Sequence, residues 1–123
     1  MKTNINYDNI VTDLVEKFPE IDSIYELHKS DNGVVLQHVF FGELTRFIIA
    51  SYRKNNLDLV DNILEILDMY LQLGDDKITN LIVASFLENL SQADKDYLRI
   101  VKILPTNLQS EIVKIDTKLA DLI

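Results

Sequence analysis

The sequence predicts an all-α fold, and three observations lead to this prediction. Apolar residues recur at helical spacing along nearly all of the 123-residue chain. Only 3 Gly and 2 Pro are present, so a turn-rich all-β fold would lack its usual turn residues. Hydrophobic residues make up 47 % of the chain, which is enough for a core. We expect residues 1–123 to form one compact domain of about six or seven antiparallel helices, stacked as HEAT-like hairpins.

The first two expected helices meet at a proline. The first covers about residues 7–17 and ends at Phe18, because a residue before proline disfavours the α region. The second runs from about 20 to 29, and Pro19 suits its first turn. The turn sequence SDNG at 30–33 then ends this helix.

The third expected helix, at about 35–54, is apolar almost all round. This pattern predicts a central helix that packs on several sides. Gly42 lies in its middle and costs about 1 kcal/mol relative to Ala, which a close helix crossing there would explain. Glu43 and Arg46 are three residues apart, a spacing at which they can pair on the helix surface.

A tight helical hairpin is expected next, from about 57–73 to about 76–90. Gly74 suits a left-handed position after the first of these helices. Asp75 or Asp76 can cap the second, so almost no loop remains between them.

Two further helices complete the expected fold. Ser91 is the expected cap of a helix at about 92–104, which Pro105 ends. The last helix, at about 106–122, carries apolar residues at alternating steps of four and three, which predicts a narrow coiled-coil-like seam. The seam residues are Leu108, Ile112, Ile115, Leu119 and Leu122.

The segment 57–76, LDLVDNILEILDMYLQLGDD, contains six acidic residues and no basic residue, which accounts for −6 of the net charge of −8. On a helix, its acidic residues up to position 68 share a stripe about 80° wide, opposite the apolar half. A solvated face is the ordinary interpretation. The lack of Lys and Arg instead favours a surface for a basic protein, because like charges at this spacing repel. The candidate partner-binding residues are Asp58, Asp61, Glu65, Asp68, Asp75 and Asp76.

The chain shows no motif for catalysis, a metal or a cofactor. It has no Cys, and its two histidines, His28 and His38, form no HExxH or ExxH pair, so both are interpreted as structural or surface residues. Its negative charge argues against nucleic acid and anionic membranes as partners. No run approaches the ~20 apolar residues of a membrane span, and MKTNINYDNI is not a secretory signal, so we expect a cytoplasmic protein.

Four segments resemble a family of small, acidic, helical bacterial proteins of unknown biochemical function: FPEIDSIYELH, HVFFGELTRF, LGDDKITNLIVASFLENL and LPTNLQ. The resemblance covers residues 14–110 and provides no catalytic residues. Members of such families are often encoded beside polymorphic toxins and are suspected immunity proteins. The resemblance therefore implies binding and inhibition of a protein toxin, and a nuclease-type toxin with a basic cleft would fit the acidic segment.

Two other functions remain open at this stage. A helical adaptor or scaffold could self-associate through the seam of the last helix, although packing of the seam inside the same chain is the more ordinary interpretation. An enzyme would need polar groups that converge in a pocket, and the sequence shows only scattered carboxylates. Tyr52, Tyr70 and Tyr97 are candidates either for the edge of the core or for anchors at a partner surface.

Overall fold

The computed structural model describes residues 5–122. The expectations for the N-terminal segment and for the limits of the domain therefore lie in part outside the described residues, at residues 1–4 and 123. No strand occurs within this range, and the all-α prediction is confirmed. The helical elements in chain order are α1 (Ile10–Lys17), η1 (Pro19–Ile21), α2 (Asp22–Asn32), α3 (Gln37–Arg53), α4 (Leu57–Leu73), α5 (Asp76–Ile82), η2 (Val83–Leu87), η3 (Glu88–Asp96), α6 (Tyr97–Lys102), α7 (Thr106–Ile115) and η4 (Thr117–Asp121).

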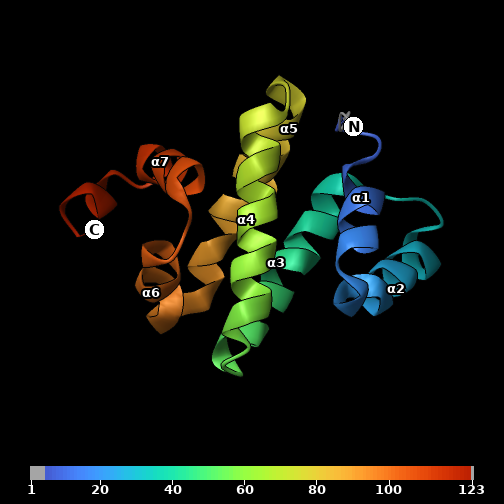
Figure 1. The fold of residues 1–123 in the computed structure, drawn as a ribbon, viewed down its shortest axis with the longest axis horizontal. Helices are drawn as coiled ribbons and strands as arrows, with labels where there is room; N and C mark the ends of the chain where they lie inside the picture. Colours follow the sequence, from blue (N-terminus) through green and yellow to red (C-terminus); the bar gives the residue numbers. More distant parts are fainter. Residues whose placement is uncertain (1–4, 123) are drawn as a thin grey trace.

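The helices are arranged around α3 and α4. Figure 1 shows α4 crossing the middle of the molecule in front of α3, with α1 and α2 on one side and α6 and α7 on the other. The α3 helix contacts α2, α4, α5, η2 and η3, which confirms the predicted central helix. A single cluster of buried apolar side chains extends from Ile10 in α1 to Leu119 in η4.

Two details of α3 differ from the expectation. Val39 is 47 % exposed, so the apolar surface of this helix is not covered all round. A Cβ atom added to the buried Gly42 would meet only the Asn89 side-chain amide, at an ordinary contact distance of 3.6 Å. The explanation predicted for Gly42, a crossing too close for a side chain, is therefore wrong, because an alanine would fit there.

The hairpin between α4 and α5 forms as predicted, with a different role for its glycine. Gly74 has an extended backbone (φ −82°, ψ 171°), not the left-handed one. A Cβ atom there would lie 2.5 Å from Cγ2 of Ile78 and 2.7 Å from the carbonyl oxygen of Tyr70. Position 74 therefore requires glycine because any side chain would clash with these atoms. The Asp75 carboxylate accepts a hydrogen bond from the backbone N–H of Ile78 (3.1 Å) and so caps α5.

The predicted helix at 76–90 continues beyond its expected end. After α5 the chain widens into the π-helical turn η2 and then tightens into the 3-10 helix η3. Within the π turn, the carbonyl of Ser85 accepts hydrogen bonds from the side chains of Asn89 (2.8 Å) and Thr45 (3.3 Å). The predicted start at Ser91 is wrong: the backbone breaks at Asp94, which has a positive φ of 52°.

The predicted seam of the last helix does not form. α7 ends at Ile115, and Asp116 leaves the helical conformation before the short helix η4 begins. Ile115 is 42 % exposed and Leu122 is 52 % exposed, while Leu108, Ile112 and Leu119 are buried in the chain's own core. The coiled-coil-like prediction is therefore wrong, and with it the structural basis for self-association through this seam.

Candidate partner-binding surface

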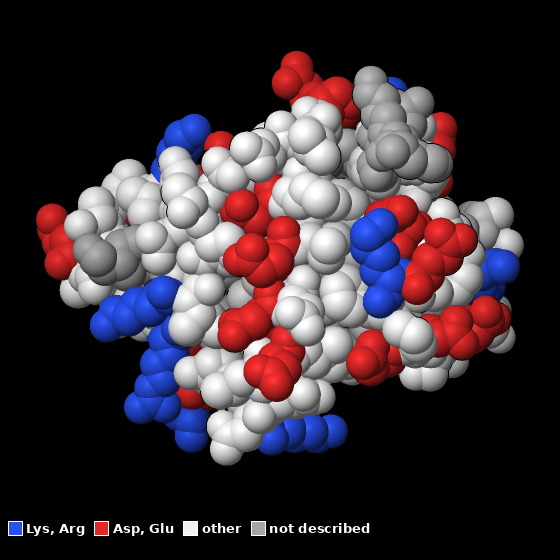
Figure 2. Space-filling model, in the orientation of Figure 1, with Lys and Arg blue, Asp and Glu red and all other residues white. Residues whose placement is uncertain are grey.

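The outer face of α4 is acidic and lacks paired cations. Asp58, Asp61 and Glu65 are exposed. Within residues 5–122, no Lys or Arg forms an ion pair with any of these three carboxylates. Figure 2 shows the resulting column of acidic side chains over α4. We call Asp58, Asp61 and Glu65 the acidic surface.

The opposite half of α4 holds this surface rigidly in place. Its inward side chains are almost or completely inaccessible to solvent: Leu59, Val60, Ile63, Leu64, Leu67 and Tyr70. The helix contacts α3, α5 and α7. Asp58 lies in the first turn, where the partial positive charge of the helix N-terminus stabilises a carboxylate. The three exposed carboxylates span about 10 Å of helix, from the rise of about 1.5 Å per residue.

Asp68, the fourth predicted residue of the stripe, is half-buried and points to another helix. Its carboxylate accepts hydrogen bonds from the backbone N–H of Leu108 (2.8 Å) and from the side chain of Asn107 (3.1 Å). Both residues lie in the first turn of α7, whose N-terminal flanking residue is Pro105 and supplies no side-chain cap. Asp68 therefore caps α7 from α4 and is not free for a partner.

The last two predicted residues lie beyond the end of α4. Asp75 is exposed, although one of its oxygens is used in the cap of α5. Asp76 is exposed in the first turn of α5. The six predicted residues are thus divided into two sets. Asp68 and Asp75 cap the starts of α7 and α5, whereas Asp58, Asp61, Glu65 and Asp76 form no ion pair with any residue from 5 to 122.

Two leucines at the ends of α4 are exposed, unlike the other leucines of its apolar half. Leu57 is 44 % exposed and Leu73 is 61 % exposed. The only sequence signal for their exposure is their position at the first and last residue of the helix, where neighbouring elements stop covering it. They place an exposed apolar side chain at each end of α4.

The three candidate tyrosines have different environments. Tyr70 is fully buried and donates a hydrogen bond to Asp13, and burial together with this bond raises its pKa. Tyr97 is half-buried and donates to Asp116 (3.1 Å); burial, followed by this bond, raises the pKa of Tyr97 to about 12. Tyr52 lines a surface hollow together with Leu57. Tyr52 therefore lies beside the N-terminal end of the acidic surface, and Tyr70 cannot act as an anchor.

Both histidines make hydrogen bonds that join elements. The buried His28 accepts the backbone N–H of Leu36 at Nε2 (2.9 Å), so its Nδ1 carries the proton that is donated to Glu43 (3.0 Å). The predicted pairing of Glu43 with Arg46 is therefore wrong. His38 is hydrogen bonded to the Ser85 hydroxyl. No group of three or more His, Cys, Asp or Glu side chains among residues 5–122 is placed to hold a metal ion.

The fold and the acidic surface together define a small, acidic, all-helical protein with a charged outer face on one central helix. Residues 11–119 match the family described as a Domain of unknown function (DUF7674), and the chain belongs to this family. No curated protein matches the chain, and no solved structure does. The HEAT-like stacking therefore remains a prediction. None of the helices in the described part of the chain is long and apolar enough to span a bilayer.

Proposed function

We propose that this protein acts by binding a basic protein through its acidic surface, as an immunity-type inhibitor of a toxin. The observation that supports this most directly is the exposure of Asp58, Asp61 and Glu65 without a paired cation on a helix whose other half is fixed in the core. Like charges at these spacings repel by a few tenths of a kcal/mol per pair. A basic partner would remove this repulsion on binding.

The acidic surface would contribute mainly to the rate of association. Charges of one sign steer an oppositely charged partner and raise the association rate in a salt-dependent manner. Most of the affinity would come from buried apolar or aromatic contacts, for which Leu57, Leu73 and Tyr52 are placed at the ends of α4. Asp68 would act indirectly, by holding α7 against α4, and Asp75 by capping the start of α5.

The toxin class rests on the family resemblance in the sequence and on charge. A nuclease toxin binds phosphate and so presents a basic cleft, which the acidic surface would occupy or border. Inhibition of this kind needs binding alone, so the chain would perform no chemistry of its own. The lack of cysteine fits a reducing compartment such as the cytoplasm, where an immunity-type protein would meet the toxin.

The proposal is tested with two variants of equal net charge. The first carries Asp58→Asn, Asp61→Asn and Glu65→Gln. The matched control removes three exposed carboxylates elsewhere that form no ion pair within residues 5–122, with Glu16→Gln, Glu26→Gln and Asp31→Asn. Each protein is immobilised and exposed to lysate of the source organism and, separately, to the purified product of each gene adjacent to its own.

We expect a basic protein to be retained by the wild type and by the control, and to be lost by the acidic-surface variant. Its association rate with the wild type should fall steeply with salt. Retention of the same partner, with the same association rate, by the acidic-surface variant would show that binding uses another surface. Retention of no basic protein by the wild type from either source would contradict the immunity-type assignment.

A further inference from the structure

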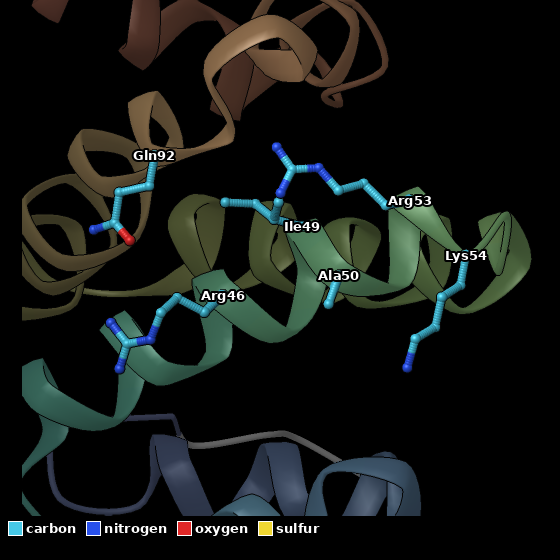
Figure 3. Close-up of a pocket in the computed structure, with 6 residues that line it drawn as sticks. All are labelled: Arg46, Ile49, Ala50, Arg53, Lys54 and Gln92. Carbon is cyan, nitrogen blue, oxygen red and sulfur yellow. The ribbon is translucent and has the colours of Figure 1, made fainter.

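A basic pocket lies on the C-terminal half of α3. It has a volume of about 470 Å³ and is lined by Arg46, Ile49, Ala50, Arg53, Lys54 and Gln92. Figure 3 shows Arg46, Ile49, Ala50 and Arg53 on one stretch of α3, Lys54 just beyond its end, and Gln92 on η3 across from them. No residue of α4 lines this pocket, so it is separate from the acidic surface. Pockets of this size accommodate small organic molecules.

The pocket carries three cationic side chains and no acidic one. Arg46 and Lys54 make no ion pair and no side-chain hydrogen bond within residues 5–122. Glu43, which could have neutralised Arg46, is bound to His28. An unpaired guanidinium in a hollow presents several N–H donors in a planar fork, which suits the oxygens of a carboxylate or phosphate.

Arg53 is held in position by contacts outside the pocket. Its Nε donates to Asp96 (2.9 Å), and its Nη2 donates to the carbonyl of Ala93 (2.8 Å). These bonds anchor the side chain on both sides of the break at Asp94 in η3 and leave Nη1 as a donor. Asp96 compensates the positive charge of Arg53, so the three cations of the pocket retain an excess of two positive charges. Because Arg53 is already ordered, less side-chain entropy is lost when it binds.

The rest of the lining suits the body of a ligand. Ile49 and Ala50 form an apolar wall, and the small Ala50 side chain leaves space between Arg46 and Arg53. Gln92 donates its amide N–H to Asn89 (3.2 Å), which leaves its carbonyl oxygen as an acceptor. The site thus offers cations, an apolar wall and one neutral acceptor.

We propose that this pocket binds a small organic anion, with a carboxylate or phosphate group on the guanidinium of Arg46 and an apolar body against Ile49 and Ala50. The two kinds of oxyanion share the same recognition by guanidinium groups, and their relative affinity identifies the natural class. This site goes beyond the proposed function, because it lies on a different helix face and involves a different kind of ligand.

The test uses the ¹⁵N-labelled full chain at pH 7, titrated with phenyl phosphate and with phenylacetate. Inorganic phosphate tests the oxyanion alone, and phenol tests the apolar body alone. Both organic anions should shift the backbone amides around Arg46, Ile49 and Ala50 in a saturable manner, with a Kd of about 1 mM or tighter. Inorganic phosphate and phenol should each bind at least about tenfold more weakly. Whichever organic anion binds more tightly gives the class.

Three variants test whether the anions bind in this pocket. Arg46→Gln removes one cation, and Ala50→Leu fills the space without changing charge; both positions are exposed on α3, so the fold should persist by circular dichroism. Lys77→Gln removes an exposed cation of α5 as a matched control. The first two should weaken both organic anions by about tenfold, and the control should bind as the wild type does.

No saturable shift with either organic anion up to about 10 mM would overturn the proposal, as would wild-type affinity in both Arg46→Gln and Ala50→Leu. Phenol or inorganic phosphate binding as tightly as the organic anions would also overturn it. None of the three variants changes Asp58, Asp61 or Glu65, so these outcomes leave the binding of a basic protein at the acidic surface untouched.

Discussion

The two central helices, α3 and α4, each contain 17 residues and pack against each other, yet their exposed side chains carry charges of opposite sign. On α4 the exposed charges are all negative, and the acidic surface has no cation to pair with inside residues 5–122. On the C-terminal half of α3 the charges are positive, and Arg53 is compensated by Asp96 from η3. A net charge of −8 therefore conceals two separate surfaces of opposite sign. Total charge alone would have suggested basic partners only.

Within α4, substitutions in the buried half and in the exposed half should differ most in their effect on the free energy of unfolding, and this is the largest effect that we expect. Leu64→Ala removes a fully buried side chain and should lower the free energy of unfolding by about 2–5 kcal/mol, because the core around it cannot fully close the cavity. Leu73→Ala changes an exposed leucine on the same helix and should alter stability by no more than about 0.5 kcal/mol. Urea denaturation measures both. Equal losses would mean that Leu73 is covered in solution.

The connection between α4 and α5 offers the next largest effect. Gly74→Ala places a Cβ atom within 2.5 Å of the Ile78 side chain and 2.7 Å of the Tyr70 carbonyl, so the hairpin must shift. We expect a loss of about 1–3 kcal/mol in urea denaturation. Gly42→Ala is the matched control, because its new Cβ meets only one atom at 3.6 Å. It should be neutral or stabilising by up to about 1 kcal/mol, since alanine favours a helix interior. A larger loss for Gly42→Ala than for Gly74→Ala would reverse this assignment of space to the two glycines.

The sequence predicted the elements best where local signals and tertiary packing agree. The bounds of α4 were predicted at 57–73 and observed at Leu57–Leu73, because a strong amphipathic pattern is followed by a glycine and a capping aspartate. The end of α7 at Ile115 carried no glycine or proline to signal it. The hydrogen bond from Tyr97 to Asp116 and the burial of Leu119 accompany that break, and both depend on the tertiary fold.

The candidate site was predictable in part for the same reason. The helical stripe of Asp58, Asp61 and Glu65 follows from periodicity, and the structure places all three at the surface. The inward use of Asp68 depends on where α7 begins in space, which one sequence does not reveal. The basic pocket was missed because Arg46 was paired with Glu43 along one helix, whereas His28 from α2 takes that carboxylate. Both errors came from contacts between elements distant in sequence.

A third prediction separates the two uses of acidic residues on α4. Asp68→Ala removes the cap of α7 and should lower the free energy of unfolding by about 0.5–2 kcal/mol. Asp61→Ala removes one exposed, unpaired carboxylate and should be neutral or stabilising by a few tenths of a kcal/mol, because repulsion along the helix is relieved. Urea denaturation at low salt compares the two. If Asp61→Ala were the more destabilising change, Asp61 would have an internal partner and would not belong to the acidic surface.

The smallest expected effect concerns the compensated cation on α3, and it depends on pH. The hydrogen bond from Arg53 is the main factor that lowers the pKa of the Asp96 carboxyl below its ordinary value of 3.8, so the folded chain holds this group ionised where the unfolded chain protonates it. The resulting stability is present above about pH 4 and is lost as pH falls through the folded-state pKa. Asp96→Asn should therefore be less stable than the wild type at pH 7. The difference between the two should shrink as the pH falls below about 4.

Glu88→Gln is the control. It neutralises an exposed carboxylate of η3 that forms no ion pair within residues 5–122. The free energy of unfolding of this variant should depend on pH as that of the wild type does. Denaturation curves at intervals from pH 7 to pH 2 measure this, and a difference between wild type and Asp96→Asn that stays constant over the whole range would mean that Arg53 is not compensated by ionised Asp96. In that case Arg53 would contribute its full charge to the pocket, and the contrast between the two helices would be larger than the ion pair suggests.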